Sequence, residues 1–491
     1  MEQQGMSGQE KYRLFRDRYP EFIYDHYDIE ETEQELAVTY HFQIPGLAAF
    51  APVWHFPKGA SKISDPLLAD MLFSLGMVEL ISYWKSACPP RVVVRAGALN
   101  TEQIRWWKDL YYNGLGEFFY VNRIQDADSQ HFMEIEAQPP GQHRHMPSCV
   151  TDDGHGQEGA GAESVGQPDP TAKSPRLPGP GTPVLVPIGG GKDSVVTLEL
   201  LKEGKAQIWG YIINPRGATL QTSSTAQIPA GQLLVARRTL DEDLLELNRQ
   251  GFLNGHTPFS AIVAFSSLIA ARLHGLPYIA LSNESSANES TVQGSTVNHQ
   301  YSKSFQFEKD FHHYTAAYLP GSSYYFSLLR PLSEFQIAAY FARCKAYHPI
   351  FRSCNVGSKK DEWCGHCPKC LFVYLILSPF LEQEEVAAIF GKDLLADETL
   401  KGTLEQLVGI QAEKPFECVG SRDEVNTAIM LTIRRIQEAG KPLPELLAHY
   451  MTTDVYERYR SVGDRYRTFF DEDDLVPMPW KELVRARCLW T

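Results

Sequence analysis

The sequence lacks a long uninterrupted hydrophobic run. Its most apolar segments, such as residues 371–381, fall short of the roughly 18–20 residues that a membrane-spanning helix needs. The opening MEQQGMSGQEKYRLF contains no apolar stretch of the kind found in a secretory signal. We therefore expect a cytoplasmic protein with no segment inserted in a membrane.

An excess of positive charge is also missing. The 491 residues include 46 Lys and Arg against 60 Asp and Glu, a formal net charge of −14. Nucleic acids and anionic membranes bind basic surfaces, so this balance argues against either as a general partner. A local basic site for a phosphorylated small molecule is compatible with it.

Cysteine is sparse for a chain of this length, with nine residues, and this excludes a disulfide scaffold. Four of them nevertheless cluster in a C-x9-C-x2-C-x2-C array: Cys354, Cys364, Cys367 and Cys370. Two-residue spacings let thiolates converge on a tetrahedral ion, and four thiolates leave no open position. The array predicts a structural Zn²⁺ site, with an iron–sulfur cluster or unliganded thiols as alternatives.

Composition divides the chain into four parts. Residues 1–137 contain strand patterns at 35–44 and 91–97 and a helix from about 101, capped by Asn100 or Thr101, which predicts an N-terminal α+β domain. Residues 138–182 are rich in Pro, Gly and Ser and predict a flexible linker. Residues 382–491 have mostly helical patterns.

Residues 183–381 alternate strand and helix patterns. Strands are predicted at 184–188, 207–215 and 276–283, with helices at 193–204 and 259–275. This alternation is typical of an α/β fold with a parallel sheet. Ser333 with Gln336 three residues later predicts the start of another helix through a capping box.

A glycine-rich turn, IGGGKDS, joins the first of these strands to the first helix. Such a turn places backbone N–H groups and a helix N-terminus around an anion. The usual P-loop is excluded because Asp193 follows Lys192, and the dinucleotide fingerprint is excluded because Ser194 stands at its third glycine.

The turn resembles the S-G-G-x-D-S loop of the N-type ATP pyrophosphatases (the PP-loop, or adenine nucleotide alpha hydrolase-like, fold), with Gly189 where that family has Ser. The resemblance implies that ATP is split to AMP and pyrophosphate. It also implies that the loop binds the ATP phosphates and Mg²⁺ through Gly189, Gly190, Gly191, Lys192, Asp193 and Ser194. The cysteine spacing is similar to the zinc site of 7-cyano-7-deazaguanine synthases, which belong to the same superfamily.

A polar segment at 281–311 follows the third predicted strand. Ligands of open α/β sheets bind beyond the carboxyl ends of the strands, so this segment is well placed over ATP. A carboxylate there can hold Mg²⁺, a lysine can offset phosphate charge and a histidine can move a proton. With Asp193, the predicted catalytic residues are Glu284, Glu289, His299 and Lys303.

Several longer runs resemble the UDP-N-acetylmuramoyl-L-alanyl-L-glutamate epimerase family (MurL). They include GMVELISYWKSACPPRVVV, WWKDLYYNGLGEFFYVN, SNESSANES, VNHQYSKSFQFE, WCGHCPKCLFVY and KPFECVG. The resemblance implies an ATP- and Mg²⁺-dependent isomerase of peptidoglycan synthesis, which inverts the terminal L-Glu of a UDP-muramoyl dipeptide through an acyl-adenylate. Candidates for the proton-transfer pair are His299, Tyr301, Lys303, Glu284, Glu289 and Cys418, and Lys85, Arg91 and Arg95 are candidates for the diphosphate.

Two other functions stay open from the sequence. One is another adenylating reaction, such as amide or nitrile formation on a carboxylate. The other is nucleotide binding without catalysis, which the glycine at position 189 keeps open.

Overall fold

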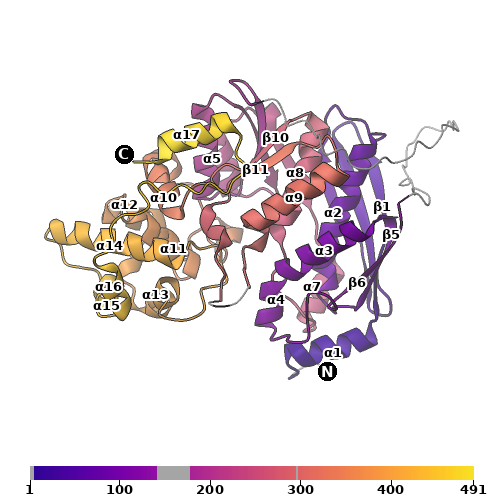
Figure 1. Cartoon of the computed structure of the whole chain (residues 1–491), viewed down its shortest axis with the longest axis horizontal. Coiled ribbons are helices and arrows are strands. Elements are labelled where there is room, and N and C mark those ends of the chain that lie inside the picture. Colours follow the sequence, from indigo (N-terminus) through magenta and orange to yellow (C-terminus); the bar gives the residue numbers. More distant parts are fainter. Residues whose placement is uncertain (1–4, 141–176, 293, 295–296, 491) are drawn as a thin grey trace. The chain divides into compact units, whose positions relative to one another are not determined.

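The computed structural model describes residues 5–140, 177–292, 294 and 297–490 (Figure 1). The central part of the predicted linker, 141–176, lies outside the described residues. The chain divides into two compact units. The first comprises Met1–Arg176, Leu234–Pro277 and Asp310–Tyr324, and the second comprises Leu177–Leu233, Tyr278–Lys309 and Tyr325–Thr491. Segments 234–277 and 310–324, which the sequence pattern grouped with the ATP-binding domain, therefore cluster with the N-terminal residues.

The first unit is built on a mixed sheet. The strand order is β9 (Leu233–Arg238), β4 (Val53–Pro57), β2 (Glu35–Ile44), β1 (Glu21–Glu31), β5 (Arg91–Ala98) and β6 (Glu134–Gln138), and β3 (Ala48–Phe50) pairs with β2. β9, β4, β2 and β1 pair antiparallel, whereas β1, β5 and β6 pair parallel. Burial alternates along β2, as its sequence predicts. The strands predicted at 35–44 and 91–97 are thus confirmed.

Helix α2 (Pro66–Trp84) corrects the sequence-based account of hydrophobic segments. It has 19 residues and is apolar enough, by length and composition, to cross a membrane, although 83% of its most apolar window is buried inside the protein. A Cβ at Gly76 would lie 2.0 Å from the Tyr24 Oη of β1, so the helix packs closely on the sheet. The helix also carries the buried Glu79, which pairs with Arg238. α2 is therefore a core helix of the first unit.

Among the other helices of the first unit, α1 (Gly8–Arg18), α3 (Thr101–Gly114) and α7 (Glu242–Arg249) begin at polar side-chain caps, whereas α4 (Gly116–Val121) and α8 (Phe259–His274) have no side-chain cap. Asn100 caps α3 and makes a capping box with Gln103, which decides between the two predicted caps. Helix α9 (Phe305–Tyr318) has residues in both units.

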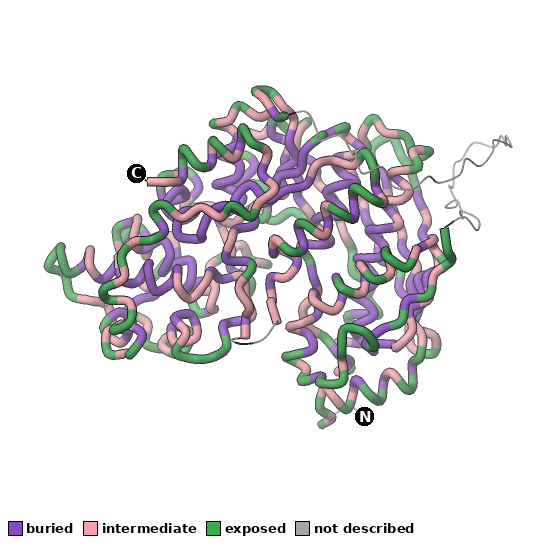
Figure 2. Tube along the Cα trace, in the orientation of Figure 1, coloured by how far each residue is buried: buried purple, intermediate pink, exposed green. Residues whose placement is uncertain are grey.

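The second unit contains the α/β alternation that the sequence predicts. Its strand order is β11 (Tyr324–Ser327), β10 (Tyr278–Leu281), β7 (Pro183–Pro187) and β8 (Gln207–Ile213), and β10, β7 and β8 are parallel. β7 leads into α5 (Lys192–Glu203), and β8 leads into α6 (Gly217–Thr225). The carboxyl ends of three parallel strands therefore meet at one edge of this sheet. Figure 2 shows buried positions running along the strands of this unit.

Helices complete the second unit, as the pattern of residues 382–491 predicts (Figure 1). Ser333 and Gln336 form the predicted capping box at the start of α10. The helices are α10 (Glu334–Arg343), α11 (Pro368–Leu377), α12 (Gln383–Phe390), α13 (Lys401–Val408), α14 (Arg422–Glu438), α15 (Glu445–Tyr450), α16 (Asp454–Tyr459) and α17 (Met478–Cys488). Short 3₁₀ turns are η1 (Ala230–Gln232), η2 (Ser285–Asn288), η3 (Tyr301–Lys303), η4 (Lys345–Tyr347), η5 (Ser358–Lys360), η6 (Leu394–Ala396) and η7 (Glu398–Leu400).

Candidate active site

The glycine loop lies at the carboxyl end of β7 in the second unit. Gly191 is the N-cap of α5 and provides no side-chain hydrogen bond to the first turn of the helix. Gly190 has φ +81°, and a Cβ there would lie 3.0 Å from the Cβ of Ala218, so only glycine fits without strain. The loop therefore presents backbone and a helix N-terminus, which is the geometry that binds phosphate.

Gly189 is the position where the loop departs from the PP-loop pattern. It is exposed, its φ is not positive, and a Cβ built there meets nothing within 4 Å. A serine side chain would therefore fit at this position. The departure removes a hydroxyl group without changing the path of the backbone.

Lys192 is buried beneath the loop. Its Nζ lies 2.5 Å from Asp193 Oδ1 and also contacts Glu334 Oε2 at the start of α10. Burial would lower the pKa of Lys192, but the two carboxylates outweigh it and hold the pKa above its ordinary value. This lysine is therefore a cation that positions two carboxylates.

Carboxylates outnumber ammonium groups around the loop. Glu284, Glu334 and Glu424 are all buried, and burial raises the pKa of each. The backbone N–H of Glu334 donates to Glu424 Oε1 at 2.7 Å, which ties α10 to the start of α14. With Asp193 the cluster has four carboxyl groups, and the ammonium groups of Lys192 and Lys303 act on Glu284, while the Glu424 carboxylate accepts from the Ser421 N–H and hydroxyl. A divalent cation would balance this excess of negative charge, so the donor set fits Mg²⁺.

Arg330 connects the backbone at Glu284 to the backbone at Lys303, on two sides of this cluster. It is fully buried, and its guanidinium donates to the Glu284 carbonyl at 2.6 Å and to the Lys303 carbonyl at 2.5 Å. Its charge is neutralised by the buried Glu308 carboxylate at 2.8 Å. The backbone positions of Glu284 and Lys303 are thus set by one side chain.

Of the residues predicted in the polar segment, the structure brings three into this cluster. Lys303 Nζ lies 3.2 Å from Cys418 Sγ, and the His299 side chain hydrogen-bonds to the same thiol. The charge of Lys303 also acts on Glu284 and Asp193. His299, Lys303 and Glu284 therefore belong to one site, together with Cys418.

Glu289 has a different environment. Its carboxylate lies 2.6 Å from Lys414 Nζ and 3.7 Å from Arg422 Nη1. Lys414 also donates its backbone N–H to the Thr291 carbonyl. These contacts indicate that Glu289 fastens the polar segment to the loop before α14.

The four predicted zinc ligands come together. Sγ–Sγ distances are 3.8 Å for Cys354 and Cys367, 3.7 Å for Cys364 and Cys370, and 3.5 Å for Cys367 and Cys370. Tetrahedral Zn–S bonds of about 2.3 Å require sulfurs about 3.8 Å apart, so the four thiols fit zinc. The backbone N–H of Gly357 also donates to Cys354 Sγ at 3.1 Å, as outer hydrogen bonds to metal thiolates do.

The cysteine cluster adjoins the glycine loop through two residues that precede Cys354. The Arg352 N–H donates to the Gly190 carbonyl at 2.8 Å, and Ser353 Oγ would lie 2.5 Å from a Cβ at Gly191. A metal held by the cysteines would therefore also stabilise the wall of the loop.

The basic residues considered for the substrate diphosphate have other contacts in the first unit. Lys85 Nζ donates to the Gly255 carbonyl, and burial lowers the pKa of Lys85 to about 8. Arg91 pairs with Glu21 and Glu136, and Arg95 pairs with Asp25 at 2.9 Å. These three residues are therefore engaged within the sheet and its helices.

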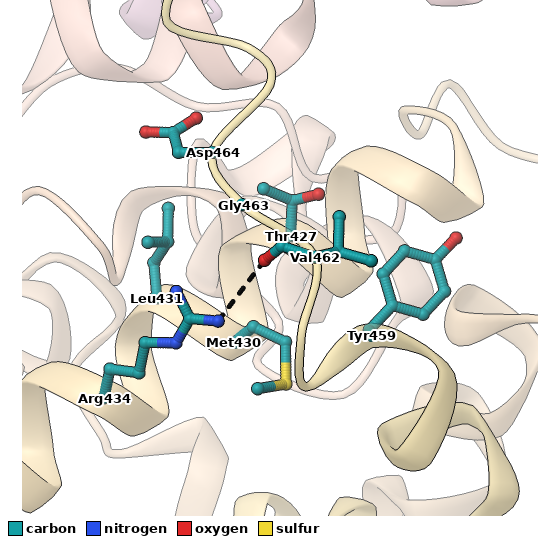
Figure 3. Close-up of a pocket in the computed structure, with 8 residues that line it drawn as sticks. All are labelled: Thr427, Met430, Leu431, Arg434, Tyr459, Val462, Gly463 and Asp464. Atoms are coloured by element: carbon teal, nitrogen blue, oxygen red, sulfur yellow. Dashed lines mark hydrogen bonds between the residues drawn. The ribbon is translucent and has the colours of Figure 1, made fainter.

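A shallow pocket lies elsewhere in the second unit (Figure 3). Arg434 donates to the Val462 carbonyl at its edge at 3.3 Å. None of the predicted site residues is among those that line it: Thr427, Met430, Leu431, Arg434, Tyr459, Val462, Gly463 and Asp464. The pocket is thus separate from the chemistry of the loop.

Sequence reasoning missed Glu334, Glu424 and Arg330. Each reaches the site through the tertiary fold, since the Lys192–Glu334 pair joins residues 142 positions apart. Two local signals were capping boxes: Ser333 with Gln336 places Glu334 at a helix start, and Ser421 with Glu424 begins α14. No comparable signal marks Arg330.

The chain matches known proteins over most of its length. Residues 14–328 match the MurL N-terminal domain, and residues 350–459 match the MurL C-terminal domain. Three relatives are named UDP-N-acetyl-alpha-D-muramoyl-L-alanyl-L-glutamate epimerase. The Xanthomonas oryzae pv. oryzae protein is 35% identical over 80% of this chain and 81% of its own length. The Salinispora tropica protein is 32% identical over 84% of this chain and 85% of its own length. The Micromonospora sp. protein is 32% identical over 88% of this chain and 90% of its own length. This chain belongs to the MurL family.

Proposed function

We propose that this chain inverts the terminal L-glutamate of UDP-MurNAc-L-Ala-L-Glu to D-glutamate and splits ATP to AMP and pyrophosphate as it does so. The reaction supplies a peptidoglycan precursor in the cytoplasm. The observation that carries the proposal is a glycine loop at the N-terminus of α5, together with the Lys303–Cys418 contact, in a chain of this family.

Adenylation solves the chemical difficulty of the reaction. The Cα–H of glutamate is a very weak acid because its removal places a second negative charge beside the carboxylate. Transfer of AMP to that carboxylate neutralises it and creates an ester-like carbonyl that can accept the electron pair. Proton removal on one face and return on the other then inverts the centre, and water cleaves the adenylate.

The loop residues divide into two roles. Gly189, Gly190, Gly191 and Ser194 surround the phosphates of ATP with backbone groups and the N-terminus of α5. Lys192 holds Asp193 and Glu334 in place from below. Mg²⁺ would be held by Asp193 with Glu284 or Glu334, and it would offset the negative charge of the phosphates.

Zn²⁺ would be held by the four cysteines in a structural role, because four thiolates leave no position for a substrate. The chain's own contribution at this site is to fix Arg352 and Ser353 against Gly190 and Gly191.

The test incubates the full chain with ATP, Mg²⁺ and UDP-MurNAc-L-Ala-L-Glu in D₂O. We expect deuterium at the glutamyl Cα, D-glutamate in the product, and AMP and pyrophosphate. Unlabelled L-glutamate with intact ATP would contradict the proposal. ATP turnover that requires ammonia would instead indicate amide or nitrile formation.

A further inference from the structure

Cys418 has surroundings unlike those of the other isolated thiols. It lies in the loop between α13 and α14 and is half-buried. The ammonium group of Lys303 lies 3.2 Å from its sulfur, and the His299 side chain hydrogen-bonds to it. The Lys303 ammonium and the His299 imidazole, which can both carry a proton, therefore meet at the Cys418 sulfur.

The charges around Cys418 favour a thiolate. Burial would raise its pKa, but Lys303, Lys369 of α11 and His299 outweigh burial and hold the pKa well below its ordinary value, even with Glu417 adjacent in the chain. Burial instead raises the pKa of Cys344 and of Cys488 to about 12. Among the described cysteines outside the four-cysteine cluster, Cys418 alone has a lowered pKa.

The thiol is also tied to the phosphate site. Lys303 acts electrostatically on Glu284 and Asp193 as well as on Cys418. Arg330 binds the backbone carbonyls of Lys303 and Glu284. It therefore fixes the spacing between Lys303, which contacts the Cys418 thiol, and the Glu284 carboxylate. Lys303 therefore interacts both with the thiol and with the carboxylates beside the glycine loop.

We infer that Cys418 is a catalytic base of the epimerisation, with Lys303 and His299 as positioning residues that hold it as a thiolate beside the glutamyl Cα. The inference rests on the proposed function. In the step, Sγ takes the Cα proton, the S–H bond forms as the C–H bond breaks, and the electron pair moves into the acyl carbonyl as an enolate.

A second, solvent-exchanging Brønsted acid on the opposite face then protonates Cα and restores the carbonyl. The thiol of Cys418 returns its proton to water, so no net proton is gained or lost. Lys303 does not itself serve as the base, because Cys418, Glu284 and Asp193 outweigh the effect of its burial and raise its pKa, which keeps it an ammonium ion.

The first test separates proton transfer from adenylation. Hydroxylamine traps an acyl-adenylate as a hydroxamate, whereas deuterium at Cα in D₂O reports proton removal. For Cys418→Ser we expect hydroxamate formation at about the wild-type rate and Cα exchange slowed about 100-fold or more, since a hydroxyl is a far weaker base. Cys344→Ser, at another half-buried cysteine of the same unit, is the matched control and should leave both rates unchanged.

Three outcomes would overturn the inference: Cα exchange at the wild-type rate in Cys418→Ser, an equal loss of hydroxamate and exchange, or equal losses in both cysteine variants. A wild-type protein that forms no hydroxamate and exchanges no deuterium would contradict the proposed function itself. The two failures are therefore distinguishable.

The second test needs no substrate. Iodoacetamide at pH 6 should alkylate Cys418 at least about tenfold faster than Cys344, as peptide mass spectrometry would measure, because only a thiolate reacts. Lys303→Met should shift the pH profile of Cys418 alkylation upward, and Lys303→Arg should restore it. Equal rates for the two cysteines, or a profile that Lys303→Met leaves in place, would contradict the positioning role.

Discussion

One buried cluster of charges in each unit can be compared, and the two clusters differ in how their charges are balanced. In the first unit, Glu79 is fully buried and matched by Arg238, whose guanidinium binds both carboxylate oxygens at 2.6 to 3.0 Å. Trp54 Nε1 also donates to Glu79 at 3.2 Å. In the second unit, the four carboxyl groups of the cluster beside the glycine loop outnumber the ammonium groups of Lys192 and Lys303, and burial raises the pKa of Glu334.

This difference in charge balance distinguishes a structural ion pair from a cluster that can bind a cation. A one-to-one pair with its hydrogen bonds satisfied stabilises a single arrangement and has no further charge to offer. A cluster with unequal charges is costly in isolation and becomes balanced when a cation binds. We therefore assign the pair in the first unit to the core and the cluster in the second unit to function.

The largest expected effect is on the balanced pair. Glu79→Ala leaves the buried Arg238 guanidinium without its carboxylate and should lower the free energy of unfolding by about 3–5 kcal/mol. Urea unfolding followed by circular dichroism measures this change. Glu102→Ala, at an exposed glutamate of the same unit, should change it by less than about 0.5 kcal/mol. Equal effects of the two variants would contradict the comparison.

Asp193→Asn should reduce the activity that we propose for the cluster beside the glycine loop, but it should not destabilise the fold. The carboxylate faces the phosphate site and is partly exposed, so its loss should reduce AMP release about 100–1,000-fold while the unfolding transition stays near that of wild type. Asp243→Asn, in the first turn of α7 of the first unit, is the matched control. Unchanged AMP release in Asp193→Asn would exclude its proposed role.

Metal removal should destabilise the second unit. We expect about one zinc per chain by atomic emission, and its removal by a chelator should lower stability by about 2 kcal/mol, a fall in Tm of about 4–8 °C. Cys367→Ser should mimic the treated protein, whereas Cys344→Ser should retain the metal. A metal-free protein with wild-type stability would argue against zinc.

The pH dependence of the stability of Glu334→Gln tests whether the buried cluster carries an excess of negative charge. Burial raises the folded-state pKa of Glu334, so its contribution to stability is fully present below its unfolded pKa of about 4.5 and is lost as pH rises through the folded value. Glutamine cannot ionise. Without divalent cations, the free energy of unfolding of the variant should therefore rise relative to that of the wild type as the pH is raised from 5 to 8.

Mg²⁺ should reduce this gain because it stabilises the ionised carboxylate of the wild type. Glu438→Gln, at an exposed carboxylate, is the control. A difference between Glu334→Gln and wild type that does not vary with pH would show that Lys192 already balances the charge.

The smallest expected effect is at Gly189. Gly189→Ser places a side chain in open space and should leave stability within about 0.5 kcal/mol of wild type. A hydroxyl donor to phosphate should tighten ATP binding about fivefold, or about 1 kcal/mol, by calorimetry. Weaker binding would mean that the loop needs glycine for a reason other than space.

Much of this architecture could be predicted because it depends on local patterns. Alternation identified β2, and β–α alternation identified the parallel sheet of the second unit. The glycine spacing predicted the turn at the start of α5, and the cysteine spacing predicted that four thiols lie together. Prediction failed where chemistry depends on distant partners. The sequence around Glu289 and Glu284 does not indicate that Glu289 pairs with Lys414 whereas Glu284 is buried beside the glycine loop. Helix α2 was missed because its apolar stretch is interrupted by Glu79, whose partner lies 159 residues away.

The long span of the Lys192–Glu334 pair has a consequence for biosynthesis. The two residues are 142 positions apart, and Glu334 is bound in turn by Glu424, a further 90 positions along. Contacts of such separation form late in folding because the intervening chain must first be ordered. A nascent chain that has made only its glycine loop therefore lacks Glu334 and Glu424, and the cluster beside the loop is complete only when synthesis has passed α14.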